Sequence, residues 1–432
     1  MLNETLLIDL REGGPPPTIS ASGLYSDVAT RTVSPGIIPY EVNSPLWSDG
    51  TWKERFIALP GSAQVEFSAG SSWSFPPNTV LVKNFGLEEE VGQRETRFLI
   101  ETRFLVRNAA TAGWSGFSYQ WTPDGQDAVL LEREAVESYF LFDSDAEDGF
   151  REQIHYFPNR SQCDQCHLGA ADHVLGVTTA QLNRLVDGVQ QLAALSDAGL
   201  FSQRIVEGFD QMPAMADPLD ESADLEARAR SYLAANCAHC HRPGAVDKAD
   251  IDLRLETPLD RTKTINRVPT LATFDLVDPR LIKPGDAANS SLYQRTLAID
   301  SGRMPPLGTE LVDVLGTDAV RRWIEAMNTA TTVGVHAGLP EGFQLDRNYP
   351  NPFNAATTMA FRLSDAGRVR FDILDVSGRL VRRLIDTPMP AGRHTVSWDG
   401  KNESGEIVAS GVYLYQLRSG PRETQRRLTL LK

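Results

Sequence analysis

The chain has 432 residues and a formal net charge of −15, a length that suits roughly three domains of ordinary size. The charge is uneven: residues 346–432 carry 14 Lys and Arg against 9 Asp and Glu, so the first 345 residues stand at −20. Such an acidic body argues against nucleic acid as a partner. The sequence has no run of 18 apolar residues, and we expect no transmembrane segment.

The N-terminal part of the chain predicts β structure. Residues 1–17 end in a Pro-rich stretch and are expected to be disordered or truncated. From residue 18 to about 142, aromatic and β-branched residues alternate with polar ones, as half-buried sheets require. The clearest strand-like runs are "WKERFIALP", "TVLVKNFGL" and "TRFLIETRFLV". We expect a β-rich domain over 18–177.

The signal changes to helix at about residue 178. Apolar residues then recur at spacings of three and four, which predicts one amphipathic helix capped by Thr178 or Thr179. The residues of this stripe are Leu182, Leu185, Val189 and Leu192. We interpret 178–221 as a helical connector.

The segment 222–329 is framed by two further predicted helices. The first ends at Cys237 and places Leu225, Ala229, Tyr232 and Leu233 on one face. The second follows a Thr317 cap and places Val320, Trp323, Ile324 and Met327 on one face.

All four cysteines of the chain lie in two C-x-x-C-H motifs. The motif residues are Cys163, Cys166 and His167, then Cys237, Cys240 and His241. Such pairs suit a zinc ribbon, a thiol redox pair, or a haem held by two thioether bonds with the histidine as axial ligand. The adjacent histidine and the repetition favour haem. We therefore predict two covalently bound haem c groups.

The segment 222–329 resembles class I cytochrome c domains. A helix leads into "CAHCH", a Met-Pro loop "SGRMPPLG" follows, and an amphipathic helix closes the segment. The resemblance implies an all-α domain with Met304 as the second axial ligand of the second haem. For the first haem, Met212 is a weaker candidate beside Met215, His173 and His155, and an open sixth position stays an alternative.

Two wider resemblances concern residues 22–327. The stretches "YEVNSPLWSDGTWKERFIALP", "YFPNRSQCDQCH" and "RARSYLAANCAHCHRPG" are similar to a family of uncharacterised bacterial dihaem c-type cytochromes. More remotely, "FPPNTVLVK" followed by "CDQCHLGAADHVLG" resembles β-sheet cytochromes such as cytochrome c′-β. We interpret Lys83, which lies in that strand, as a solvated lysine.

Residues 346–432 follow a short linker at 330–345 and predict about seven short strands. The "YPNPF" opening, the "SGVYLYQL" strand and the terminal lysine resemble the C-terminal sorting domain of type IX secretion, which is similar to the Ig-like module of flagellar hook-capping proteins. The resemblance implies an Ig-like β-sandwich and the type IX secretion machinery as a partner.

The sequence therefore favours an exported, multidomain dihaem cytochrome that transfers electrons to a redox partner that the sequence does not name. Two alternatives stay open: a haem enzyme that acts on peroxide or a nitrogen oxide, and a surface adhesion module. The expected location is the periplasm to the cell surface or medium. The start of the chain lacks the profile of a secretory signal, so we expect the natural N-terminus to be missing.

Overall fold

The computed structural model divides the chain into two compact units, Met1–Thr331 and Thr332–Lys432. It describes residues 14–327 apart from 71, 112, 147, 246–249, 271–273 and 275, and then 344–345, 348, 351 and 353–430 apart from 355, 364, 377, 391 and 421. Most of the predicted N-terminal segment 1–17 and almost all of the predicted linker 330–345 lie outside the described residues.

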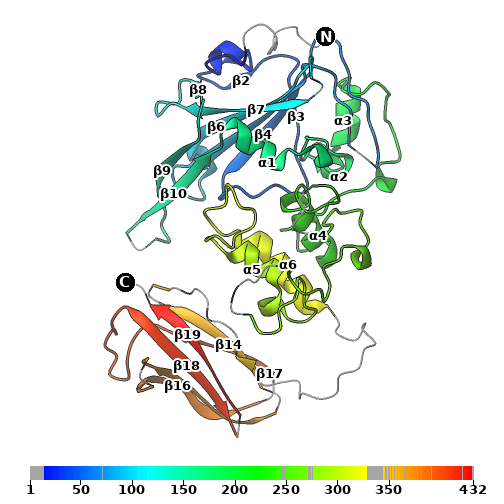
Figure 1. Ribbon diagram of the computed structural model, residues 1–432. Helices are drawn as coiled ribbons and strands as arrows, with labels where there is room; N and C mark the ends of the chain where they lie inside the picture. The colour runs from blue at the N-terminus through cyan, green and yellow to red at the C-terminus, as the bar shows by residue number, and fades with distance from the viewer. Residues whose placement is uncertain are drawn as a thin grey trace. The chain divides into compact units, whose positions relative to one another are not determined.

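The first unit is built on a six-stranded antiparallel sheet. Its strands, in spatial order, are β3 (Ile38–Pro39), β4 (Trp52–Ala58), β5 (Val80–Glu88), β6 (Arg97–Arg107), β7 (Trp114–Trp121) and β8 (Ala128–Leu130), side by side in Figure 1. Two small hairpins accompany it, β1 (Tyr25–Asp27) with β2 (Thr32–Val33), and β9 (Ala135–Phe142) with β10 (Phe150–Phe157). The three predicted strand-like runs correspond to β4, β5 and β6.

Both faces of this sheet pack against other segments. Successive side chains along a strand point to opposite faces, so neighbouring residues of one strand belong to different cores. Val80 and Val82 belong to a core cluster with the N-terminal segment around Ile19 and Leu24. Leu81, between them, belongs to a second cluster with residues 174–201. The helix α1 (Arg160–Cys166) lies against β7.

The predicted single helix from residue 178 is wrong. The chain instead forms α2 (Thr179–Leu182), a hairpin of β11 (Leu185–Val186) and β12 (Val189–Gln190), and α3 (Gln191–Asp197). Asp187 and Gly188 have positive φ angles of 48° and 80°, as a tight hairpin turn requires. Thr178 does cap α2, since its side chain accepts a hydrogen bond from the backbone of Gln181.

Three further α-helices follow in this unit: α4 (Leu225–Asn236), α5 (Ser291–Leu297) and α6 (Val314–Ala326). Short 3-10 helices are found at Ser20–Ser22, Arg94–Thr96, Gly169–Ala171, Phe209–Gln211, Leu259–Arg261 and Ala287–Asn289. The predicted apolar face of α4 is confirmed, with Ala229, Tyr232 and Leu233 buried. The last helix begins earlier than predicted: Asp313, not Thr317, is the cap of α6.

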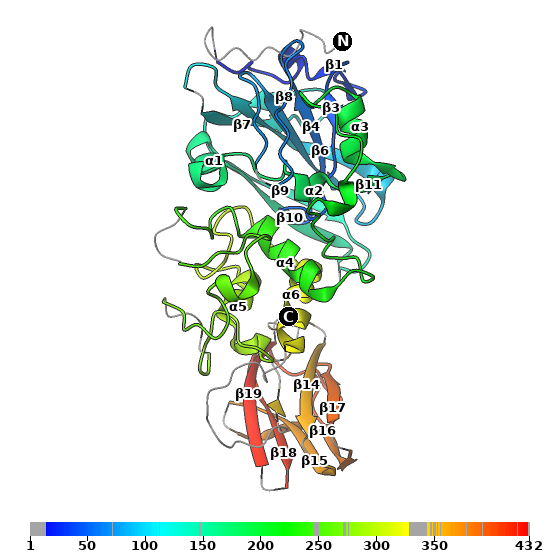
Figure 2. The same cartoon turned by 90° about the vertical axis from the view of Figure 1, so that its right-hand side faces the viewer.

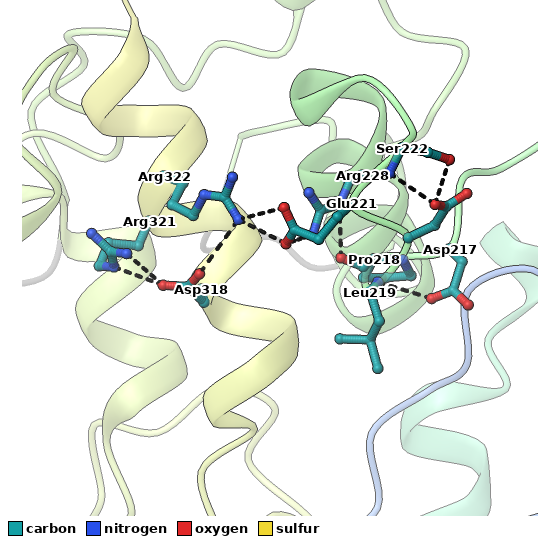
Figure 3. Close-up of polar contacts among 10 residues, drawn as sticks. Asp217, Pro218, Leu219, Glu221, Ser222, Arg228, Asp318, Arg321 and Arg322 are labelled. Carbon is teal, nitrogen blue, oxygen red and sulfur yellow. Dashed lines mark hydrogen bonds and ion pairs between the residues drawn. The ribbon is translucent and has the colours of Figure 1, made fainter.

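The helices α4 and α6 pack side by side (Figure 2) and are joined by ion pairs. Glu221, which precedes α4, accepts hydrogen bonds of 2.8 Å from both Arg228 of α4 and Arg322 of α6 (Figure 3). The buried Arg228 also donates to the carbonyl of Pro218 at 3.0 Å. This network fixes the entry of α4 relative to α6.

The prediction of a separate all-α cytochrome c domain is wrong. In segment 222–329, the described residues form three α-helices joined by long irregular stretches. These helices belong to the same compact unit as the sheet. The backbone of Trp47 donates to Asn236 of α4 at 2.7 Å, and the backbone of Leu311 donates to Asp49 at 2.8 Å. The first unit is thus a β-rich body to which helices are tied.

The second unit contains two antiparallel sheets in its described residues. One has the order β13 (Gln344–Leu345), β14 (Thr357–Leu363), β17 (Gly392–Trp398). The other has the order β16 (Leu380–Met389), β15 (Gly367–Leu374), β18 (Gly411–Ser419), β19 (Arg422–Leu430). One apolar cluster, which includes Phe361, Phe371 and Trp398, draws residues from both sheets and forms the core of this unit.

Candidate functional site

The first C-x-x-C-H motif lies on α1, which a capping box starts. The side chain of Asn159 accepts from the backbone of Gln162, and the Gln162 side chain accepts from the backbone of Asn159. Cys163 then meets Gly116 of β7 so closely that a Cβ on the glycine would lie 2.7 Å from the cysteine Cβ. Glycine at this position therefore lets α1 approach the sheet.

The second motif begins where α4 ends. Cys237 is the C-terminal cap of α4, and His241 donates its backbone N–H to the Cys237 carbonyl at 2.9 Å. Burial raises the pKa of the Cys237 thiol to about 12. The Nδ1 atom of His241 is buried and has no hydrogen-bond partner among the described residues.

The fold brings the two motifs together, although residues 168–236 separate them in sequence. Cys240 Sγ donates to the Gln165 carbonyl at 3.7 Å. The thiols of Cys166 and Cys240 also hydrogen-bond, which raises the pKa of Cys166 to about 12 and lowers the pKa of Cys240. All four cysteines are free thiols in the structure.

The candidate histidine ligands have different surroundings. His167 and His173 are linked reciprocally, each Nδ1 lying within 2.8 Å of the other's backbone carbonyl oxygen. Burial lowers the pKa of His167 and that of His241 to about 4. His155 is instead committed to Glu101, with 2.8 Å between His155 Nε2 and Glu101 Oε2.

The methionine candidates are spread over the first unit. Met304 lies between α5 and α6, where its backbone N–H donates to the Arg295 carbonyl at 3.0 Å. Met212 packs against the apolar cluster on the helical side of the sheet. Met215 lines the cavity described below. The roles of these residues stay predictions.

A cavity of about 210 Å³ lies between the sheet and the two motifs. Its polar lining comprises Tyr40, Ser44, Arg55, Lys83, Arg103, Cys163, His167, Thr178, Gln181, His239 and Arg242. Three of these residues are cations that lie opposite one another on β4, β5 and β6, namely Arg55, Lys83 and Arg103. We call these three residues the cationic row. Lys83, interpreted from the sequence as a solvated lysine, is instead half-buried and lines this cavity, where burial lowers its pKa well below the ordinary value.

One carboxylate sits beside this row of cations. The fully buried Glu101 receives two hydrogen bonds from Arg103, at 2.7 and 2.8 Å, and a third contact from His155. Burial alone would raise the pKa of Glu101, but Arg103 and His155 lower it to about 2. Glu101 is thus ionised and engaged by these two partners.

Sequence reasoning did not find the cationic row, although a signal exists. Arg55, Lys83 and Arg103 each lie two residues from an apolar residue that points to the same buried face, namely Ile57, Leu81 and Leu105. Only the pairing register of the three strands shows that the three charges oppose one another.

Comparison with known proteins places a family match within the second unit. Residues 349–420 match the family described as FlgD Ig-like domain. The basal-body rod modification protein FlgD of Salmonella typhimurium is 30% identical over 141 residues, which are 33% of this chain and 47% of that protein; its Salmonella typhi counterpart gives the same values. The chain thus spans about half the length of these curated relatives.

Solved structures give similar partial matches. FlgD from P. aeruginosa is 24% identical over 17% of this chain and 57% of its own, with a TM-score of 0.15. FlgD from Xanthomonas campestris is 25% identical over 17% of this chain and 55% of its own, also with a TM-score of 0.15. Dimeric latent PorU from Porphyromonas gingivalis is 20% identical over 22% of this chain and 10% of its own, with a TM-score of 0.18.

These findings correct the predicted identity. The family match and the curated relatives point to hook-capping proteins, so the predicted identity as a dihaem c-type cytochrome is overturned. The predictions that depended on it are overturned as well. These are the two covalent haem c groups, electron transfer, the haem enzyme and the adhesion module. The zinc alternative gains no support either: the described residues contain no group of three or more His, Cys, Asp or Glu placed to hold a metal ion.

The predicted partners are corrected in part. The family match and the curated relatives are to FlgD and give no support to the expected type IX secretion machinery as a partner. Across the described residues, no helix has the length and apolar character needed to cross a membrane.

Proposed function

We propose that the second unit is an assembly module that docks this chain onto a larger protein assembly, of the kind that the hook-capping relatives serve. The observation that carries the proposal is the FlgD Ig-like match over 349–420, which covers most of this two-sheet unit. The charge supports it: 14 basic against 9 acidic residues in 346–432 favour an acidic partner surface.

The docking surface is assigned to one end of this unit. Val376 lies in the turn before β16 and Leu380 is the first residue of β16. The loop that carries Ile407 is joined to this strand, since Glu403 donates its backbone N–H to the Val381 carbonyl at 3.1 Å. Val376, Leu380 and Ile407 are 72%, 45% and 65% exposed. Exposed apolar side chains on neighbouring loops are typical of protein contact sites.

The test is cosedimentation of the full chain with assembled flagellar hooks. Leu380→Asp places a charge on the docking surface and is expected to reduce the pelleted fraction at least fivefold. The matched control is Leu185→Asp, which changes a 63% exposed leucine in the first unit and leaves binding unchanged. Equal pelleting of the two variants would contradict the assigned surface, and no pelleting of the unsubstituted chain would contradict the docking function.

A protein that docks onto such an assembly must itself be exported. We therefore propose that the chain is located in the periplasm, at the cell surface or in the medium. Fractionation of cells that produce the natural full-length protein tests it. Recovery of the protein only from the cytoplasm would contradict this location.

A further inference from the structure

The cationic row is arranged against ordinary electrostatic preference. Arg55 lies directly opposite Lys83, and Lys83 lies directly opposite Arg103, on three neighbouring strands. Like charges in directly opposed positions of a sheet destabilise it. The first 345 residues of the chain are strongly acidic, so the gathering of three half-buried cations on one face of the sheet is not a consequence of composition.

Only one end of the row is neutralised. Arg103 is held by Glu101 in a two-pronged ion pair. In the part of the chain that the structure describes, the Lys83 ammonium has no carboxylate or hydrogen-bond partner, and its Nζ lies over the Phe85 ring, 5.0 Å from the ring centroid. Burial lowers the pKa of Lys83 well below its ordinary value, and the neighbouring Arg55 acts in the same direction.

The three cations also border open space. They line the cavity of about 210 Å³, and apolar side chains of Val42, Leu81 and Val174 complete its wall. A mostly apolar cavity with a few converging polar groups is the usual form of a small-molecule site. Charges withdrawn from water are normally paired, and among the described residues Lys83 and Arg55 make no ion pair with a carboxylate.

We propose that this cavity binds a compact organic anion, whose carboxylate pairs with Lys83 and Arg55 and whose apolar body lies against Leu81 and Val174. The anion supplies the charge that the row lacks. The apolar wall distinguishes such a ligand from a bare inorganic anion, which would leave that surface without contacts. The site lies in the first unit and is independent of the docking proposal for the second.

The test uses the full chain, in low-phosphate buffer, by isothermal titration calorimetry. Benzene-1,3-dicarboxylate is the probe, its neutral diamide controls for charge, and inorganic phosphate controls for the apolar body. The dicarboxylate is expected to bind at one site and at least tenfold more tightly than either control. Equal binding by the diamide or by phosphate, or no binding of the probe, would overturn the proposal.

Single substitutions test whether the probe binds at the cationic row. Lys83→Met is expected to weaken the probe at least tenfold, and Lys263→Met, which removes a 54% exposed lysine of the same unit, is expected to have no effect. If Lys83→Met fails to fold, Arg55→Met replaces it. Equal affinity in all variants would overturn the assignment. A mass of the denatured protein above the 47.6 kDa of the polypeptide would also overturn the proposal, because a covalently attached group would then already fill the cavity.

Discussion

At the scale of single residues, the close approach of α1 to the sheet depends on Gly116. A Cβ at this position would lie 2.7 Å from Cys163 Cβ and 2.8 Å from its Sγ, and neither belongs to a long flexible side chain. Gly116→Ala is therefore expected to destabilise the first unit by about 1–3 kcal/mol through overpacking. Urea unfolding measures this change.

Gly70→Ala is the control, because no atom lies within 4 Å of its added Cβ. The account of α1 packing would fail if both substitutions had the same effect.

Glu101 makes the first unit sensitive to acid. Its pKa, about 2 in the fold, lies below the ordinary value of 4.5, because Arg103 and His155 outweigh burial. A depressed carboxyl pKa stabilises the fold above the unfolded value, and this contribution is lost as pH falls from about 4.5 towards 2. Urea midpoints measured between pH 7 and pH 2.5 should show that fall.

Glu101→Gln should flatten this pH dependence and cost about 1.5–3 kcal/mol at pH 7, since it removes the charge-assisted hydrogen bonds between Glu101 and the half-buried Arg103. Glu88→Gln breaks a half-exposed pair with Arg97 and should cost only about 0–1 kcal/mol. Similar losses in the two variants would show that Glu101 has no special role.

At the scale of elements, the link between α4 and α6 depends on Arg228, whose side chain is 5% exposed. Arg228→Met removes its hydrogen bonds to Glu221 and Pro218 and is expected to lower stability by about 1.5–3 kcal/mol. Arg322→Met removes the 39% exposed partner on α6 and should have a much smaller effect. Thermal unfolding of both variants measures the difference, and a reversed order would contradict this account of the network.

Much of the element pattern could be predicted from the sequence. The strand-like runs located β4, β5 and β6, and helical spacing located α4, because each of these segments supplies apolar side chains to a core. The helix expected from residue 178 failed because Leu185 and Val189 satisfy helical spacing by chance and are 63% and 56% exposed. The Asp187-Gly188 turn was the overlooked signal.

The site was less predictable than the elements. Motif spacing singled out the two cysteine pairs, but their meeting at Gln165 and Cys240 depends on long-range packing. The opposed charges of β4, β5 and β6 depend on strand register, which one sequence alone does not fix.

At the scale of the whole molecule, the two units have separate cores and opposite charge balance. Removal of residues 346–432 is therefore expected to leave the first unit folded, with its melting temperature changed by less than about 2 °C, because its hydrogen bonds and apolar clusters lie upstream. Near-ultraviolet circular dichroism of the shortened chain measures this. Loss of its cooperative transition would show that the units depend on each other.

The central claim is that the second unit docks the chain onto a protein assembly. The most direct measurement compares the cosedimentation of the full chain and of the chain lacking 346–432 with assembled hooks over a range of concentrations. The account predicts saturable pelleting of the full chain and none above background for the shortened chain. Equal pelleting of both chains, or a full chain that stays in the supernatant at every concentration, would contradict it.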